Sequence, residues 1–257
     1  QRCPGRDKGR SYVALCFHCA SHCLNLVLVH SSKITPIRLA AGLVGSICAS
    51  FSASTKRIRL LQEHAEMNVP SSKKERLKPP CATRWVESHH AFVVFKELLV
   101  PILHCLEQLQ HQGGDTGTHA HQYLSAVCRC DFITSLFVIE SFSTLFLPLS
   151  IYLQSKSLDI SAVESVDNIL TVLKQRRENA DLEFRTLSVE VTEFCRTFDI
   201  DIRKPQICDR QTQRENHPSE STEEYFRVPC YLQYLDNLVE GFVFLFSDLR
   251  KEEKKKL

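Results

Sequence analysis

Residues 15–29 are the stretch that bears most on the fold and function of this chain. Their sequence is Leu15-Cys16-Phe17-His18-Cys19-Ala20-Ser21-His22-Cys23-Leu24-Asn25-Leu26-Val27-Leu28-Val29. The first half of this stretch is a cluster of cysteine and histidine, and the second half is an apolar run. Metal binding, nucleophilic catalysis and packing in a hydrophobic core are all candidate roles for it. Locally, we expect a short strand from Tyr12 to Cys16, then a buried helix from His22 to Val29 with Ser21 as its N-cap.

The composition is that of an ordinary soluble globular protein. The chain has 257 residues, which is long enough to bury a hydrophobic core. Its net charge is only +2, so no overall electrostatic field indicates a nucleic-acid or membrane partner. Its first residues lack the apolar core of a signal peptide, and no run approaches roughly 18 apolar residues, so we expect no membrane contact. Because it begins with Gln1 and ends in a lysine run without a closing element, we interpret it as a fragment.

Twelve cysteines would suit a disulfide framework in a small secreted protein. This chain is long, however, and most of its cysteines stand alone among apolar neighbours. We therefore predict reduced, mostly buried thiols in the cytosol or the nucleus. The isolated cysteines are Cys3, Cys48, Cys81, Cys105, Cys195, Cys208 and Cys230.

Helical periodicity covers most of the remaining chain. Apolar residues recur at three- and four-residue steps over 37–68, 86–111, 120–153, 160–199 and 230–250. We expect one helix over each of these ranges, except that the first is either one long helix or two broken near Gly42 and Gly45, and the second has a kink or break at Pro101. Residues 203–223 are polar and form a connection. The predicted fold class is mainly α, with the one strand before Cys16.

Five stretches resemble, in the same order, the motifs of hAT-superfamily transposases and of host proteins domesticated from them. The first, Cys19-Ala20-Ser21-His22-Cys23-Leu24-Asn25-Leu26, is similar to a C-x-x-H-x-L-N-L signature. The combination resembles the subgroup of zinc finger MYM-type proteins and the repressor of the inhibitor of the protein kinase, although Phe226 stands where that subgroup has tyrosine. The other matching positions are Ser52 to Arg57, Thr83-Arg84-Trp85, Pro148 to Ser155, and the set Arg210, Arg214, Asn216, Tyr225, Arg227 and Asp236.

The resemblance implies an RNase H-like α/β core interrupted by a long all-helical insertion. Residues 1–34 would be a segment of the core, 35–202 the insertion domain, 203–229 a polar connection, and 230–257 a C-terminal helix with a charged tail. Strand transfer in this family needs three carboxylates on two metal ions. We expect these carboxylates outside the chain, since Asp7 lies among Gly, Arg and Lys and does not resemble the end of a buried strand. The chain itself is then no enzyme and needs no cofactor, and Mg²⁺ is implied only for a complete parent.

DNA is the partner that the resemblance implies, with the nucleus as the location and homo-oligomer formation through segments outside this chain. Arg84 beside Trp85 suits stacking on an extruded base, although packing of the indole against Phe92 explains Trp85 equally well. Four basic residues suit contacts with DNA phosphates, although a solvated helix face and a lysine-rich loop explain them nearly as well. These four are Lys56, Arg57, Lys73 and Lys74.

A zinc site is the alternative reading of the N-terminal cluster, with Cys16, Cys19, His22 and Cys23 as ligands. Structural zinc sites usually pair two knuckles across a loop, whereas these ligands are bunched and would diverge at a strand–helix junction. His22 could instead face a scissile phosphate, because unpaired amides at a helix N-terminus favour an anion. Simple packing of the histidine and cysteines explains the cluster at least as well.

Two functions therefore remain open. The chain is either part of an hAT transposase-derived protein that binds DNA without catalysis in this segment, or a helical protein-interaction module without DNA contact. The second reading leaves the cytoplasm as the alternative location.

Overall fold

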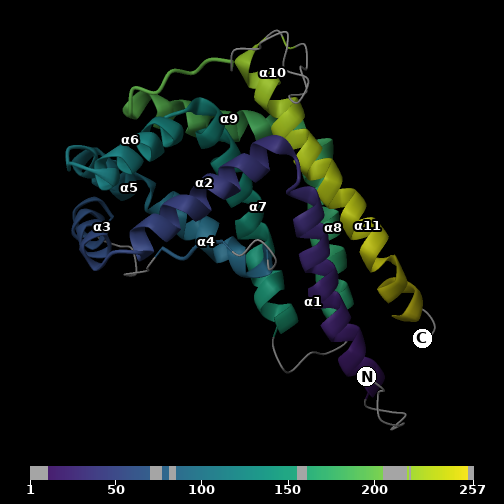
Figure 1. The fold of residues 1–257 in the computed structure, drawn as a ribbon. Helices are drawn as coiled ribbons and strands as arrows, with labels where there is room; N and C mark the ends of the chain where they lie inside the picture. Colours follow the sequence, from purple (N-terminus) through teal and green to yellow (C-terminus); the bar gives the residue numbers. More distant parts are fainter. Residues whose placement is uncertain are drawn as a thin grey trace.

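The computed structural model describes the backbone of residues 11–69, 77–80, 85–154, 161–204, 219 and 221–253, and the side chains of these residues except 11–20, 85–87, 161–163, 245 and 247–253. Within these ranges the chain forms eleven α-helices and one π-helix, and no strand (Figure 1). The prediction of a mainly helical protein is confirmed for the described residues.

The N-terminal helix α1 (Ser11–Ser31) replaces the strand expected over Tyr12–Cys16, and that prediction is wrong. Five apolar residues are too few for periodicity to separate a strand from a helix, and Ala14 and Leu15 are strong helix formers. The described residues therefore show no edge strand of an RNase H-like core. Ser21 lies in the interior of α1, so its predicted role as an N-cap is also wrong.

Helices α2 (Thr35–Ser52) and α3 (Thr55–Asn68) divide at Ala53 and Ser54 rather than at a glycine. Ser54 has φ −145° and ψ 124°, an extended conformation that ends the helical path. Gly42 and Gly45 lie inside α2, because a helical glycine costs only about 1 kcal/mol relative to alanine and the buried side chains of this helix offset that cost.

The next helices are α4 (Trp85–Glu97), α5 (Leu99–Gln110), α6 (Asp115–Val127) and α7 (Cys130–Gln154). The predicted interruption of the first pair is confirmed. It falls at Leu98, which places Pro101 in the first turn of α5, where a missing N–H costs no hydrogen bond. The segment predicted as one helix over 120–153 is divided between α6 and α7.

A single helix was also expected over 160–199, and this prediction is wrong. The chain forms α8 (Ser161–Glu178) and α9 (Ala180–Thr197), with Asn179 between them. The Asn179 side-chain amide donates to the carbonyl of Gln175 at 2.9 Å. Asparagine competes in this way with the backbone ladder, so a helix can end without glycine or proline.

The last helical run starts earlier than the expected residue 230. It consists of α10 (Thr222–Phe226), the π-helix η1 (Arg227–Leu232) and α11 (Gln233–Glu253). The Ser221 hydroxyl accepts from the Glu224 amide at 3.0 Å and caps α10. Pro229 lies within η1 and has no N–H to donate, and such single π turns are common at functional sites.

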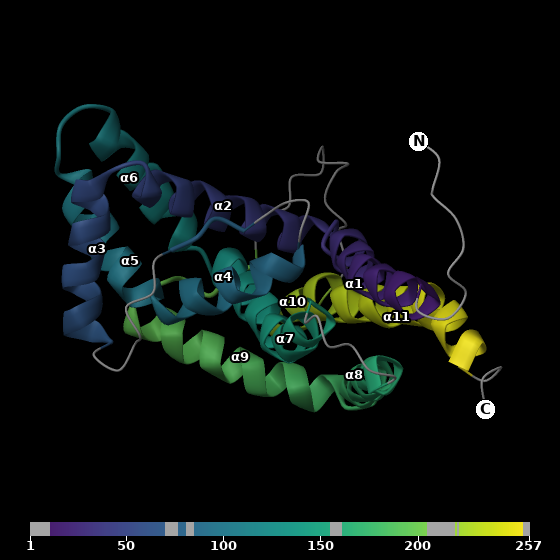
Figure 2. The same cartoon turned by 90° about the horizontal axis from the view of Figure 1, so that it is seen from below.

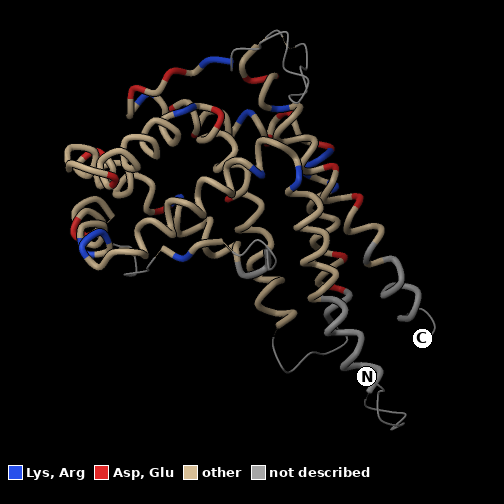
Figure 3. The backbone as a smooth tube through the Cα atoms, in the orientation of Figure 1, with Lys and Arg blue, Asp and Glu red and all other residues tan. Residues whose placement is uncertain are grey.

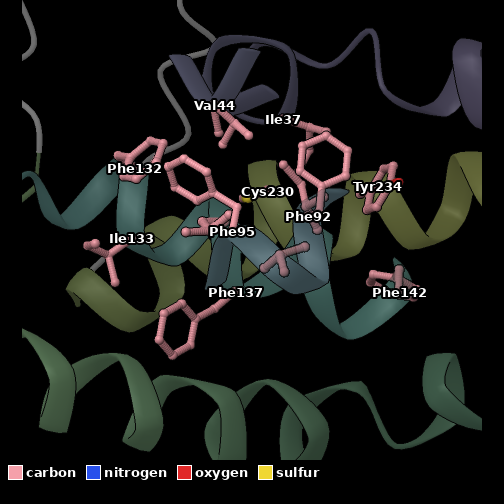
Figure 4. Close-up of a cluster of buried hydrophobic side chains, with 14 of the residues drawn as sticks. Ile37, Val44, Phe92, Phe95, Phe132, Ile133, Phe137, Phe142, Cys230 and Tyr234 are labelled. Atoms are coloured by element: carbon pink, nitrogen blue, oxygen red, sulfur yellow. The ribbon is translucent and has the colours of Figure 1, made fainter. Parts of the chain in front are cut away.

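The 25-residue helix α7 is the centre of the fold. Helix α4 packs along it, α2 crosses it, and α9 covers another side (Figures 1 and 2). Figure 4 shows the resulting core, in which aromatic side chains of α4 and α7 meet aliphatic side chains of α2. Within the described residues α7 is the single helix long and apolar enough to cross a membrane, and α1 with α2 would qualify only as one pair bent by 107°. More than half of the apolar stretch of α7 is buried, as expected for a core helix.

Helices α1 and α11 run side by side in opposite directions, with α8 beside α11 (Figures 1 and 2). Their close approach depends on Gly241, because a Cβ atom there would lie 2.8 Å from Cγ1 of Val27. Leu24, Val27 and Leu28 of α1 are completely buried in the same hydrophobic cluster as α7. The first and last long helices are thus joined to one continuous core, while the domain limits set out above stay a prediction.

The described cysteines whose side chains are placed are free thiols, as expected. Cys48, Cys105, Cys195 and Cys230 are all buried. Burial raises the pKa of the Cys48 and Cys230 thiols to about 12, so these thiols stay protonated and unreactive.

Candidate functional site

The residues of the N-terminal motif point in different directions from one helix. His22 is exposed, Cys23 and Leu24 are buried, and Asn25 is half-buried. Because His22 lies in the interior of α1, the amides around it are used by the helix, and the prediction that it sits at a helix N-terminus is wrong. The side chains of Cys16 and Cys19 lie outside the described residues. Within the described part of the chain, no group of three or more His, Cys, Asp or Glu side chains could hold a metal ion.

The predicted DNA-contacting residues are described only in part. Lys56 and Arg57 lie in the first turn of α3, where Figure 3 shows the basic positions grouped. Arg57 is half-buried and its guanidinium donates to Oγ of Ser50 at 3.4 Å. Trp85 begins α4, but its side chain lies outside the described residues. The whole of Lys73, Lys74 and Arg84 lies outside them as well, so the DNA surface stays a prediction.

The C-terminal motif residues hold helices together. Asp236, in the first turn of α11, accepts from Nε of Arg177 at 2.5 Å, and Arg227 of η1 pairs with Asp181 of α9. The two ion pairs link the α8–α9 corner to the π-helix and α11. Each is at least partly exposed, so each contributes about 1 kcal/mol or less, but together they fix the corner. Arg210, Arg214 and Asn216 lie outside the described residues.

Tyr225 and Phe226 of the same motif line a groove with a volume of about 630 Å³. Phe226 is buried, and the Tyr225 ring packs edge-on against it, with 5.2 Å between the two ring centroids. Its lining residues come from the first half of α2, the end of α6, the start of α7, and from α10, η1 and the start of α11. Leu39 lies on the rim of the groove with 56% of its surface exposed. A concave, largely apolar site of this size is what a ligand or a partner segment requires.

Polar groups converge on this groove from three elements. Lys33 is exposed at the α1–α2 corner, and Gln233 and Asn237 lie one turn apart on α11. Arg129 donates two hydrogen bonds to the Asp131 carboxylate at 2.9 and 2.7 Å, so this pair is largely neutralised. Lys33 is therefore the lining residue whose positive charge no carboxylate among the described residues balances.

Sequence reasoning did not identify the groove, because its walls come from segments nearly 200 residues apart. It also missed His89, which is 1% exposed in α4. Nδ1 of His89 lies 3.2 Å from Oγ of Ser143, and Nε2 is buried without a partner among the described residues. Burial lowers the pKa of His89 to about 3, so the ring is neutral. Its position three residues before Phe92 on the buried face of the helix is the signal that could have found it.

Fold and site together define a helical domain with a π-helical turn beside an apolar groove. This domain is distantly similar to the 52 kDa repressor of the inhibitor of the protein kinase of Homo sapiens, at 23% identity over 241 residues, covering 90% of this chain and 31% of the human protein. The mouse protein of that name is 22% identical, with 90% of this chain and 32% of the mouse protein covered. The chain thus spans about a third of the length of these curated relatives. No family model matches it, and no solved structure does.

Proposed function

We propose that the chain is part of an hAT transposase-derived protein, with residues 35–202 as its helical insertion domain, and that it contributes to DNA binding in its parent without catalysing strand transfer. The similarity to the 52 kDa repressor supports this, because it extends over 90% of the chain. The ordered series of hAT-like motifs in the same sequence agrees with it. The observation that carries the proposal is the pairing of α1 with α11, which brings the first and the last of these motif regions onto neighbouring helices.

The geometry of that pair suits an inserted domain. Helix α1 precedes the proposed insertion of residues 35–202 and α11 follows it, and the two helices run side by side (Figures 1 and 2). A domain can be inserted into a host domain at little cost when its entry and exit lie close together, because the host chain need not be spread apart. In the proposed parent, an RNase H-like core carries the three carboxylates and the Mg²⁺ ions outside this chain.

DNA binding is tested by the fluorescence anisotropy of a labelled 40-base-pair duplex and a labelled hairpin, titrated with the chain at several salt concentrations. We expect the affinity to fall steeply as salt rises, because phosphate contacts release counterions. Arg84→Ala and Trp85→Ala should weaken binding, whereas Arg185→Ala, at an exposed position of α9, should change it less than twofold. Binding that is insensitive to salt, or equal for all three variants, contradicts the proposal.

The absence of catalysis is tested with the same DNA and Mg²⁺ or Mn²⁺. We expect no cleavage and no strand transfer by the chain alone, and robust cleavage would refute this part of the proposal. Nuclear location follows from the same proposal, and imaging of the tagged full-length parent tests it.

A helical protein-interaction module is the second candidate, and the apolar groove favours it. In that case the chain should bind a protein partner with an affinity that salt hardly changes, and the DNA titration should show no specific binding. The two candidates are thus separated by one set of titrations.

A further inference from the structure

We propose that the groove between α2, α7 and η1 binds a peptide segment of a partner protein that carries an aspartate or glutamate next to a bulky apolar residue. This inference concerns protein binding and does not depend on the DNA-binding role proposed above. Three features of the groove determine the chemistry of the occupant: its apolar lining, its unbalanced positive charge and its pair of side-chain amides.

The apolar lining selects a bulky side chain. The groove is lined by Pro36, Leu39 and Leu43 of α2, by Phe226 of α10 and by Pro229 of η1. The Leu39 side chain stays 56% exposed, although it borders a buried core. Covering it with an aliphatic or aromatic residue would remove apolar surface from water, which favours binding.

The charge of the groove selects an acidic neighbour for that side chain. Lys33 is exposed, and its Nζ lies 3.4 Å from Nδ1 of His30, while Arg129 is already paired with Asp131. Helix α2 begins next to Lys33, and its first turn has no side-chain cap and no acidic residue. The partial positive charge of this helix end adds to that of the lysine, so a carboxylate is favoured there and an ammonium group is not.

The paired amides favour a peptide over a small apolar acid. Gln233 and Asn237 are four residues apart on α11 and both face the groove. Neither side-chain amide is hydrogen-bonded to another of the described residues. Each carboxamide can donate and accept, which matches the alternating N–H and C=O groups of a peptide backbone. The groove is also partly open to solvent, so a peptide segment can enter it.

The proposal is tested by selecting random 12-residue peptides, displayed on phage, for binding to the full chain. The best peptides are then synthesised with a fluorescent label and titrated by anisotropy. We expect the enriched peptides to combine Asp or Glu with a bulky aliphatic or aromatic residue. Leu39→Glu should weaken their binding at least tenfold, and Lys33→Glu should weaken it severalfold at low salt.

Two matched variants control for surface charge. Leu182→Glu changes a leucine on α9 that is 66% exposed, and Lys174→Glu changes an exposed lysine on α8. Both should leave peptide binding within twofold of the unchanged chain, and circular dichroism should show that all four variants are folded. The proposal is overturned if no peptide is enriched, if the enriched peptides lack acidic residues, or if Leu39→Glu binds as tightly as Leu182→Glu. The proposal is also overturned if the enriched peptides match a stretch of this chain, because the occupant would then be a second copy of it.

Discussion

As pH is lowered, His89 should decrease the free energy of unfolding of this protein at pH values where its carboxylates are still ionised. The ring is 1% exposed, lies 5.6 Å from the Phe146 ring, and has a folded-state pKa of about 3, because burial disfavours the imidazolium. In the unfolded chain its pKa is about 6.5. The unfolded state therefore binds a proton that the folded state does not, so the free energy of unfolding decreases as pH falls from about 6.5 toward about 3, and this contribution stays intact above about 6.5.

The size of the effect follows from these two values. Between about pH 7.5 and about pH 5, linkage predicts a loss of about 2 kcal/mol from His89 alone. This number hardly depends on the folded-state pKa, provided that it stays below about 4, since the folded ring is then neutral throughout the range.

Urea denaturation of the chain and of His89→Gln at both pH values measures the effect. The glutamine variant removes the titrating group and keeps a hydrogen-bonding side chain near Ser143, so its pH-dependent loss should be smaller by about 2 kcal/mol. His111→Gln, at an exposed histidine after α5, should keep the full loss. An equal loss for the unchanged chain and His89→Gln would refute the reasoning, because it would mean that His89 is protonated in the folded state.

Three further predictions concern the packing of the last helices. Gly241→Val should destabilise the fold by about 1–3 kcal/mol, measured by urea denaturation, because its side chain would overlap Val27; a neutral result would show that α1 and α11 can separate without cost. Tyr231→Phe should leave the melting temperature unchanged or raise it, because the hydroxyl is buried without a partner among the described residues; a loss of several degrees would reveal a hydrogen bond. A double-mutant cycle of Arg227→Ala and Asp181→Ala should give a coupling of about 0.5–1 kcal/mol that decreases at high salt, and zero coupling at low salt would argue against the ion pair.

Helix content and the state of the cysteines were predictable from sequence because both are local properties. The three- and four-residue apolar spacing marks helices wherever they pack, and isolated cysteines among apolar neighbours tend to be buried. The interruption before Pro101 was predictable for the same reason, since the constraint lies in the proline ring. The breaks at Ser54 and Asn179 were missed, because single polar residues end those helices through their own backbone conformation or side-chain hydrogen bonds.

The N-terminal motif shows where such reasoning stops. A short apolar run such as Tyr12–Cys16 fits a strand and a helix equally, and the longer α1 decides between them. Once α1 is a continuous helix, His22 loses the free amides that made it a candidate anion site. The pattern of that motif did predict correctly that Leu24 is buried, because it shares a helix face with Val27 and Leu28.

The sequence by itself therefore determined that this protein is mainly helical, where most of its helices lie, and that its described thiols are free. Only the tertiary structure decided that α1 pairs with α11, that Arg227 and Asp236 hold the α8–α9 corner, that His89 is buried, and that a groove forms between α2, α7 and η1. The physical reason is that an amphipathic pattern encodes which face of a helix avoids water. It does not encode which other face, far away in the chain, will cover it.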